Sequence, residues 1–497
     1  MTRVIAKDLR IAWDHVNYVD ESARLVSATG SMRLAPPEDS LTSGGGIVDQ
    51  CSLILNNSDG RYSPLNTGGA LYAYLTGGGA YQAPMYLRVS VNGGSSYDRI
   101  FTGVIKIPVE SGATSKDAAT VTIDCRSVDE FVMSYRDSTS LATFTANHTA
   151  GKTEAELITT WLTDAGIAAG DVVADTGMFV IPWAWLDDES PLADAWALAA
   201  ACGGRLYADP DGDFRYENAA HWLKHTSSSA TLTAASAGQF RPWYNDRDIY
   251  SEVVVETASR DILDADTIWT ADEIVTVPSG ATITYTAKMR QPAWTITGCT
   301  YTAVTSGGTD ITASISITRT DYAQRSVLSI VNAHATQAAQ LVVLELTGQA
   351  VSGRPGAEER ATSDRTGAAT FWSTRPGRTR TMSGNAYVQT QAQAAFQADF
   401  LADRYALPRL FWRVSGIPGV PARRLGDRLT LNDTSIMSAA RDVFVIAITW
   451  RLGAAGFSQD YEGIDAADLF PYQNTSPGYF VIGTSTLKVS ASDRLFY

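Results

Sequence analysis

One turn-rich stretch organises the first part of the chain: Asn56-Asn57-Ser58-Asp59-Gly60-Arg61-Tyr62-Ser63-Pro64-Leu65-Asn66. Asp-Gly and Ser-Pro are turn dipeptides, because Gly adopts a positive φ readily and Pro fixes its own φ and restrains the residue before it. The apolar run 51–55 leads into this stretch as a strand, and strand patterns follow at 85–91, 100–107 and 119–125. These residues alone predict an irregular turn inside a β domain.

Length and composition indicate a multidomain globular protein. A chain of 497 residues is too long for one ordinary core, so we expect three or four domains. Hydrophobic residues make up 45% of the chain and charged residues 19%, which is typical of folded proteins. No apolar run reaches the roughly 18 residues of a membrane helix, and charges interrupt positions 1–13, so neither a membrane span nor a signal peptide is predicted. We expect the chain to be kept in a cytoplasm until it is released.

The cysteines predict neither a metal site nor a disulfide framework. They stand far apart, at positions 51, 125, 202 and 299, and form no C-x-x-C motif. Buried free thiols are the expectation, and a Cys51–Cys125 bridge is the one pairing to check.

The net charge of −14 argues against a protein that binds nucleic acid by neutralising phosphates. Much of the acidity lies in residues 141–223, where three basic residues stand against thirteen acidic ones. A solvated acidic surface explains this excess without any further function.

Residues 141–235 have the pattern of a small α/β domain. The capping box Thr153-Glu154-Ala155-Glu156 opens a helix that carries an apolar face and ends at Gly166. A second helix runs from Ser190 to the Gly203-Gly204 pair, and two short strands follow, joined by the acidic turn 209–213.

The whole chain is predicted to be mainly β and multidomain. The expected parts are a first β domain at 1–140, the α/β domain at 141–238, strands at 239–259 that pair with the last β domain, a β-sandwich at 260–370, and a last β domain at 371–497 with a helix at 385–405 and a C-terminal extension.

Two distant segments share an order of features. Residues 88–107 contain a strand, a loop, an Asp-Arg pair and a Phe-containing strand, and residues 428–450 contain a strand, a loop, an Arg-Asp pair and a Phe-containing strand. Chance similarity between hairpins is one explanation, and two copies of one barrel in a single chain is the preferred one. We therefore predict that 88–107 superposes on 428–450.

Three parts of the chain together resemble the tail hub proteins of tailed bacteriophages, the baseplate or tail-tip hubs that close the distal end of the tail tube. The first part covers roughly residues 45–135 and includes the turn-rich stretch. The second comprises 190–198, Gly203-Gly204-Arg205-Leu206-Tyr207, Asp211-Gly212 and 214–216, and the third is Leu425-Gly426-Asp427-Arg428-Leu429.

This resemblance implies two tube-type β-barrels in one chain, with the α/β domain and the sandwich as accessory domains. It implies a structural virion protein that joins the tail tube to the tail tip or baseplate and gates the channel for DNA ejection. As a homotrimer it would offer six near-equivalent barrels to a six-fold tube.

The same resemblance implies the partners and the location. The partners are the tail tube or a distal tail protein ring, tail-tip or fibre proteins, and DNA in transient passage without stable binding; an acidic channel suits such passage. The location is the virion tail tip, after assembly in the host bacterial cytoplasm. No enzyme activity, catalytic residue, cofactor or metal ligand is implied.

Residues 146–153 satisfy a relaxed phosphate-loop pattern and precede a helix. Ala146 replaces the first glycine, no Walker-B strand is evident, and Thr153 is explained as a helix cap. We interpret the segment as structural.

Three further patterns could carry chemistry but also have structural explanations. The acidic turn 209–213 has three carboxylates, but it lacks the other calcium ligands of an EF-hand loop. The run 187–189 favours the dipole of the following helix and would need a partner to act as a glycosidase pair. His221 and His225 have i+4 spacing without the glutamate of a zinc-protease motif.

The remaining candidates leave two other functions open. Cys202 has no evident catalytic histidine. Exposed aromatics could stack on sugars, but buried or interface aromatics are commoner; the residues concerned are Trp183, Trp185, Trp243 and Tyr244. The alternatives are a tail-associated cell-wall hydrolase and a carbohydrate-binding adhesin that uses the sandwich.

Overall fold

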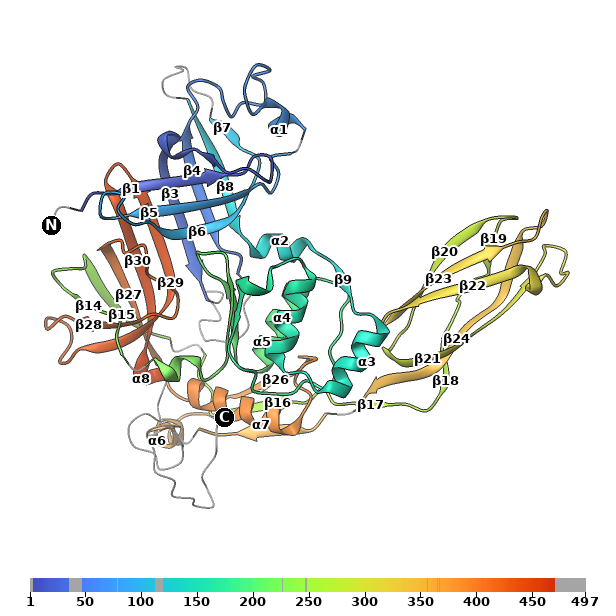
Figure 1. The fold of residues 1–497 in the computed structure, drawn as a ribbon. Coiled ribbons are helices and arrows are strands. Elements are labelled where there is room, and N and C mark those ends of the chain that lie inside the picture. The colour runs from blue at the N-terminus through green and yellow to red at the C-terminus, as the bar shows by residue number, and fades with distance from the viewer. Residues whose placement is uncertain are drawn as a thin grey trace.

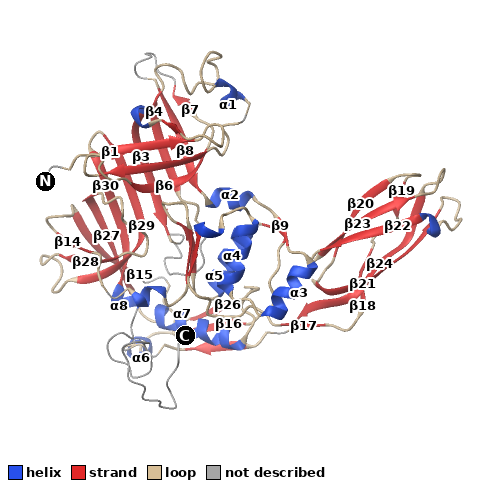
Figure 2. Ribbon diagram, viewed as in Figure 1, coloured by secondary structure: helices blue, strands red, loops and turns tan. Residues whose placement is uncertain are grey.

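A computed structural model gives the fold of residues 3–469, apart from 35–46, 78, 112–118, 226, 246–247, 355, 364 and 366, which are not described. Two β units stand together at one end, a small α/β domain lies in the middle, and a β-sandwich projects at the other end (Figure 1). Strands dominate every part except the middle (Figure 2). The expected C-terminal extension, 470–497, lies outside the described residues.

The first β unit is built from half-buried strands. In β8 (Thr120–Ser127), Val121, Ile123 and Cys125 are buried and alternate with more exposed residues, as a sheet with one covered face requires. Its other elements are β1 (Ala6–Ile11), β2 (Val19–Asp20), η1 (Ser22–Arg24), β3 (Leu25–Arg33), β4 (Gln50–Asn56), α1 (Tyr72–Thr76), β5 (Pro84–Ser90), β6 (Asp98–Ile105), β7 (Val109–Ser111) and α2 (Asp129–Ser134).

The second β unit is assembled from two distant parts of the chain. Its elements are β14 (Ala230–Thr233), β15 (Gln239–Asn245), β27 (Arg409–Pro418), β28 (Arg428–Asn432), β29 (Arg441–Gly453), β30 (Gly456–Asp465) and α8 (Ala466–Leu469).

The two units repeat one strand order. Neighbouring strands are β3, β4, β8, β6 and β5 in the first unit and β15, β27, β30, β29 and β28 in the second, and every pairing in both rows is antiparallel. A short helix follows the corresponding last strand, α2 after β8 and α8 after β30. The next neighbour differs, since β1 is antiparallel to β5 whereas β14 is parallel to β28. This shared order agrees with a duplicated unit.

Backbone hydrogen bonds fix how the two units align. Gln82 donates to the carbonyl of Ile105 at 3.1 Å, and Gly426 donates to the carbonyl of Val445 at 2.8 Å. Gln82 and Gly426 both have a left-handed backbone, with φ of 57° and 80°. Each therefore ends the same tight turn just before β5 or β28.

This alignment corrects the predicted match between the segments. Pro84, two residues after one turn, corresponds to Arg428, two residues after the other, so the predicted equivalence of Arg88 and Arg428 is wrong by four residues. The sequence match followed the arginines, but the position of the strand is set by the turn before it.

The predicted pair of closed barrels is not seen in the described residues. Their strands form one open path of a 14-stranded sheet that ends at β15 and β2. The physical reason is the length of β29. Residues 441–444 of β29 pair with β28, and residues 447–452 pair with β3 of the first unit. The two sheets are thereby joined edge to edge.

The α/β domain follows its sequence pattern as far as residue 224, whereas 230–233, which were predicted to belong to it, form β14 of the second β unit. The capping box at Thr153 and Glu156 is present and begins α4 (Glu154–Asp164), and the predicted strands 205–208 and 214–217 pair as β12 (Arg205–Ala208) and β13 (Phe214–Glu217). Its other elements are β9 (Asp137–Ser138), α3 (Leu141–Ala150), η4 (Ala169–Asp171), β10 (Val172–Ala174), β11 (Asp187–Glu189), α5 (Pro191–Ala201) and η5 (His221–Lys224).

The projecting domain consists of two sheets around a separate core that includes Leu328, Ile330 and Leu344. The long strand β24 (Ala339–Gly353) pairs with four of the others. Those others are β17 (Arg260–Ile262), β18 (Asp266–Thr270), β19 (Val275–Val277) and β21 (Ala293–Val304); β20 (Thr282–Lys288), β22 (Ile315–Asp321) and β23 (Arg325–Asn332) form the second sheet, and η6 (Thr312–Ser314) connects them.

A third small sheet lies beneath the α/β domain. It contains β25 (Glu358–Ala361), β16 (Glu252–Glu256) and β26 (Thr379–Met382), and α6 (Ala368–Ser373) lies between β25 and β26 along the chain. Of the strands in 239–259, only β15 pairs with the last β unit, because β16 pairs with β25 and β26 instead.

The helix expected at 385–405 begins later, as α7 (Gln391–Tyr405). Thr390 caps it by accepting a hydrogen bond from the N–H of Gln393. Before the cap, Asn385 donates to the carbonyl of Ala197 at 2.9 Å, so the preceding segment is held by tertiary contacts rather than by helical bonds. No helix in the described ranges is long and apolar enough to cross a bilayer.

Candidate functional site

The turn-rich stretch is held as a rigid loop by its own asparagines. Asn57 accepts a hydrogen bond from the N–H of Tyr62 at 2.9 Å and donates to the carboxylate of Glu110 on β7 at 2.8 Å. Asn66 donates to the carbonyl of Gly60 at 3.0 Å, and Gly60 has the positive φ that the Asp-Gly turn predicts. These bonds hold the loop in this conformation and attach it to β7.

Glu21 lies at the centre of the contacts that fasten this loop to the first strands. Its carboxylate accepts hydrogen bonds from Trp13 at 3.0 Å, Arg61 at 2.7 Å and the Tyr62 hydroxyl at 2.6 Å. Its side chain is only 1% exposed. Burial, and then the hydrogen bond to Glu21, raise the pKa of Tyr62, so that the hydroxyl remains a donor. No pattern in the sequence pointed to Glu21.

Apolar side chains are exposed around this rigid loop. Leu65 is 85% exposed, and Ile107 and Val109 next to Glu110 are 45% and 67% exposed. A rigid surface that offers apolar side chains to solvent is typical of a protein–protein contact.

The edge-to-edge junction of the two β units is closely packed. Trp450 of β29 stands opposite Gly30 of β3 and is fully buried. A Cβ atom on Gly30 would lie 2.3 Å from the Trp450 ring, so only glycine leaves room for this side chain. Arg33 of β3 forms an ion pair with Glu462 of β30 at 2.6 Å. The junction thus fixes the two units relative to each other.

The acidic turn 209–213 fixes the α/β domain against both β units. Asp209 accepts hydrogen bonds from backbone N–H groups inside the turn. Arg99 of β6 donates to the carbonyl of Asp211 at 2.8 Å, and Arg424 pairs with the Asp211 carboxylate at 3.0 Å. The oxygens of Asp209 and Asp211 that were considered for calcium are used in this way, and no group that could hold a metal ion is found among the described side chains.

The phosphate-loop-like segment is a helix followed by a turn. Its first five residues lie in α3, whose C-terminus is capped by Gly151 with a left-handed φ of 69°, and Thr153 caps α4. A phosphate cradle needs free N–H groups in a loop, whereas here they belong to a helix.

Substitutions in this segment should separate capping from phosphate binding. We expect Thr153→Ala to lower the free energy of unfolding by about 1 kcal/mol, because it removes the cap. Lys152→Ala should leave stability and assembly nearly unchanged. Thermal melts and an ATP titration are the measurements, and micromolar ATP binding that disappears in Lys152→Ala would contradict the structural interpretation.

The two histidines at i+4 spacing do face each other. The Nε2 atoms of His221 and His225 are 3.2 Å apart, and Nδ1 of His221 lies 2.7 Å from the carboxylate of Asp175. Residues 187–189 form β11, directly before α5, and Glu189 lies beside Asp194 of α5. Burial raises the pKa of Asp194, which accepts a 2.6 Å hydrogen bond from Tyr387.

The aromatics considered for sugar stacking belong to two different places. Trp183 stacks on His148 at 3.8 Å between ring centroids and lies 5.8 Å from Trp294 of the sandwich, where the α/β domain meets the sandwich. Trp185 lies in the same cluster, 5.6 Å from Phe144. By contrast, Trp243 and Tyr244 are on β15 and are 40% and 64% exposed.

All four cysteines are free thiols, and three of them are buried, as expected. Cys51 and Cys125 stand opposite each other on β4 and β8 without a bridge. Burial raises the pKa of Cys51 and Cys202, which makes both thiols poor nucleophiles.

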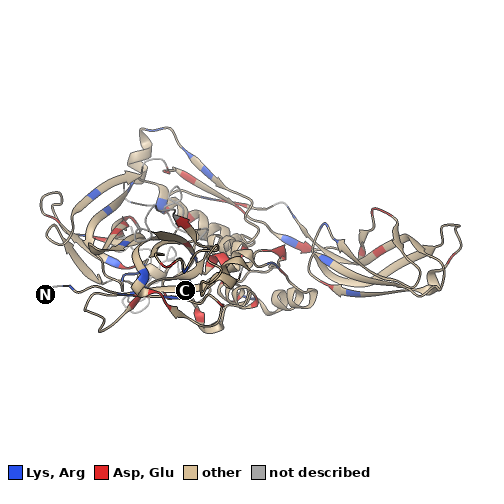
Figure 3. Cartoon of the chain, turned by 90° about the horizontal axis from the view of Figure 1, so that it is seen from above, with Lys and Arg blue, Asp and Glu red and all other residues tan. Residues whose placement is uncertain are grey.

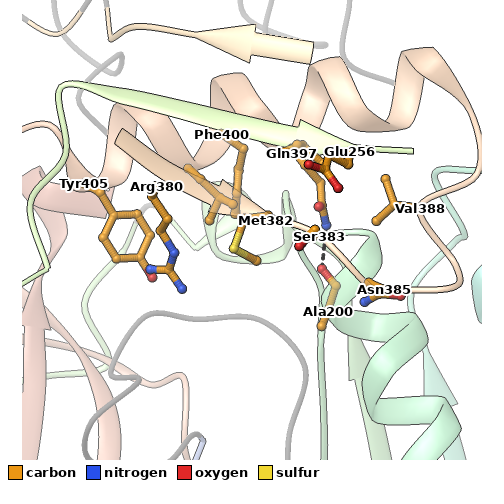
Figure 4. Close-up of a pocket in the computed structure, with 13 residues that line it drawn as sticks. Ala200, Glu256, Arg380, Met382, Ser383, Asn385, Val388, Gln397, Phe400 and Tyr405 are labelled. Carbon is orange, nitrogen blue, oxygen red and sulfur yellow. Dashed lines mark hydrogen bonds between the residues drawn. The ribbon is translucent and has the colours of Figure 1, made fainter. Parts of the chain in front are cut away.

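A small cavity lies between α7, α5 and the sheet of β16 and β26 (Figure 4). Its walls include Arg380, Glu256 and Phe400, and Gln397 donates to the carbonyl of Ala200 at 2.6 Å across one side. The volume is about 110 Å³, whereas small-molecule sites usually measure about 300 Å³ or more. The cavity fits solvent better than a substrate.

Asp129, at the start of α2, is a buried carboxyl group. Burial raises its pKa to about 6, although the Ser127 hydroxyl donates to it at 2.5 Å. Burial and the charge of Asp129 also raise the pKa of the nearby Asp49.

This geometry predicts a pH dependence of stability. The pKa of Asp129 is higher in the folded protein than in the unfolded chain. Its contribution to the free energy of unfolding is therefore fully present below about pH 4 and is lost as the pH rises through about 6. We expect Asp129→Asn to raise the free energy of unfolding at pH 8 by about 2–3 kcal/mol and to change it little at pH 4. Urea unfolding at both pH values measures this. Glu130→Gln is the matched control, and a gain as large in the control would contradict the assignment.

Charged residues of both signs are mixed along the chain. In the view of Figure 3, acidic and basic residues are interspersed over the β units and the sandwich.

No family model and no curated protein matches this chain. Solved structures align over most of its length. A tail protein from Neisseria meningitidis has 10% identity and a TM-score of 0.48 over 94% of this chain and 98% of its own. A 43 kDa tail protein of prophage MuSo2 from Shewanella oneidensis has 12% identity and a TM-score of 0.47 over 93% and 99%. The prophage tail protein gp18 from Listeria monocytogenes has 8% identity and a TM-score of 0.40 over 92% and 94%. At TM-scores below 0.5, these alignments carry no conclusion about function.

Proposed function

We propose that this chain is a structural tail hub of a tailed bacteriophage or prophage, which joins the tail tube to the tail tip or baseplate and gates the channel for DNA ejection. The observation that carries the proposal is the repeated β unit. One chain offers the same order of five strands twice, as a protein would need in order to match a tube of higher symmetry than its own.

The sequence resemblance supports the proposal at the level of single residues. Asn57, Arg61 and Tyr62 of the turn-rich stretch form the hydrogen bonds that hold a rigid, apolar surface loop. Interface residues, rather than catalytic ones, are the functional residues of such a protein.

The proposed assembly is a homotrimer with pseudo-six-fold symmetry, in which each of three chains contributes two β units. Its partners are the tail tube or a distal tail protein ring on one side and tail-tip or fibre proteins on the other. DNA passes through the channel without stable binding, which suits the net negative charge. The protein is assembled in the host bacterial cytoplasm and resides at the tail tip of the virion.

Cryo-electron microscopy of assembled tails tests this function. We expect one ring of three chains at the distal end of the tube, with two β units of each chain facing the tube. Six chains in the ring, or one chain attached at the side of the tail, would overturn the proposal.

The projecting sandwich supports a second candidate role, recognition of a surface glycan. It extends away from the β units on a joint formed by Trp183 and Trp294, so it is placed to reach a partner (Figure 1). Binding of the full chain to a glycan array would support this role. If the array gives no signal, the sandwich is instead a contact for other tail proteins.

A further inference from the structure

Several strands of the two β units have a single partner in the part of the chain that the structure describes, and two of them, β15 and β7, are related by the repeat. β15 pairs with β27 only, and β7 pairs with β8 only. The unpaired N–H and C=O groups of such an edge are a template for another strand. Apolar side chains are exposed at both edges, Trp243 and Tyr244 on β15 and Val109 on β7.

The repeat shows which strands these two edges correspond to. In each unit, residues that stand opposite one another on neighbouring strands form a row across the sheet. The row that ends at Ile105 in the first unit is Gly30, Cys51, Cys125 and Ile105, and the row that ends at Val445 in the second is Pro242, Trp412, Gly463 and Val445. Gly30 of β3 therefore corresponds to Pro242 of β15.

The same rows relate β7 to the second half of β29. Ile105 corresponds to Val445, and in both strands the register shifts by one residue shortly afterwards. Val109 consequently corresponds to Thr449. The two unpaired edges are thus the counterparts of β3 and of the second half of β29, which pair with each other inside the chain.

We infer that β15 of one copy pairs antiparallel with residues 107–111 of a second copy, which repeats between chains the junction that β3 and β29 make within one chain. The pairing of these two edges is inferred from the repeated strand order of the two β units. Only the number of copies in the assembly rests on the proposed function, a ring of three chains.

The internal junction also fixes the register of this contact. Ser31 stands opposite Thr449, so Trp243 should stand opposite Val109 of the second copy. Trp243 and Val109 are both apolar, and they are 40% and 67% exposed in the single chain. A single chain in water does not require exposed apolar side chains at these two positions.

Tyr244 gives an independent argument for the same occupant. Its counterpart in the internal junction is Met32, which is 3% exposed and stands opposite Ile448. Tyr244 is 64% exposed in the single chain. A second copy that places Pro108 opposite Tyr244 would cover it in the same way.

Pro242 makes the contact selective. Proline has no N–H group, so this edge offers one hydrogen bond fewer to any strand and is protected against indiscriminate pairing. Side-chain fit at Trp243 and Tyr244 must then select the partner. Because each edge fits the other and not itself, the contact is heterologous and repeats until a ring closes.

Disulfide trapping tests the inferred register in the full chain. In the variant with Trp243→Cys and Val109→Cys, mild oxidation of assembled tails and of concentrated purified protein should join separate chains, seen as covalent multimers on non-reducing gels. The variant with Ser31→Cys and Thr449→Cys is the matched control for the internal junction and should form a bridge within one chain.

A third variant controls for random collision. Trp243→Cys with Ile262→Cys has a second thiol that is 40% exposed on the sandwich, and it should give at least tenfold less multimer. Val109→Glu, without any added cysteine, should keep the wild-type melting temperature and lose the non-covalent multimer of the concentrated purified protein. This readout needs no disulfide.

The outcomes separate this inference from the proposed function. No covalent multimer in either sample, or equal amounts in the Ile262 control, overturns the pairing of these edges even if tails contain a three-chain ring. Multimers that form in purified protein but are absent from any tail structure would support the pairing and overturn the hub function.

Discussion

Glu21→Ala should be among the most destabilising single substitutions in the first β unit. The change leaves Trp13, Arg61 and the Tyr62 hydroxyl without their common acceptor, in a place where the Glu21 side chain is only 1% exposed. Removing one partner of a buried charged network typically costs about 3–5 kcal/mol, because the remaining groups stay desolvated and unpaired. We therefore expect a loss of this size in the free energy of unfolding.

Hydrogen exchange of β3, β4 and β8 during urea unfolding measures this loss locally. The matched control is Asp59→Asn, which breaks the exposed Arg24–Asp59 pair and should cost less than about 1 kcal/mol. Glu21→Gln keeps the shape and part of the acceptor capacity, so it should lie between the two. Equal losses for Glu21→Ala and Asp59→Asn would show that the buried carboxylate does not hold the loop.

Gly30→Val should open the junction between the two β units. The added Cβ would lie 2.3 Å from the ring of Trp450, which is fully buried and cannot turn away without leaving its site. Overpacking of this kind costs about 3 kcal/mol, near the upper end of the usual range. We expect faster exchange of the β3 and β29 amide hydrogens and a lower melting temperature.

A double-mutant cycle identifies the cause of the effect. In a Trp450→Leu background the added side chain has more room, so the cost of Gly30→Val should fall by more than about 1 kcal/mol. Ser31→Val, at the next and exposed position of the same strand, controls for strand propensity and should be close to neutral. An unchanged cost of Gly30→Val in the Trp450→Leu background would show that the clash with the ring is not responsible.

Local patterns determined much of this fold from the sequence. The capping box at Thr153 begins α4 because an N-cap and its glutamate lie within one turn of each other. The alternation in β8 and the Asp-Gly turn at Gly60 were readable for the same reason, since each depends on residues a few positions apart. Such neighbours also favour a structural interpretation of the phosphate-loop segment and the acidic turn.

What the sequence could not determine depends on residues that are distant in the chain. Glu21 meets Tyr62, and β3 meets β29, only after folding, and no periodicity in either segment marks the partner. The predicted match of Arg88 with Arg428 failed because residue type was compared, whereas the register of a strand is set by backbone hydrogen bonds at the turn before it. Local chemistry thus determined which segments became strands and helices. Only the tertiary structure decided which edges pair, because backbone hydrogen bonding between strands is the same for almost every side chain and the choice is made by packing across the whole sheet.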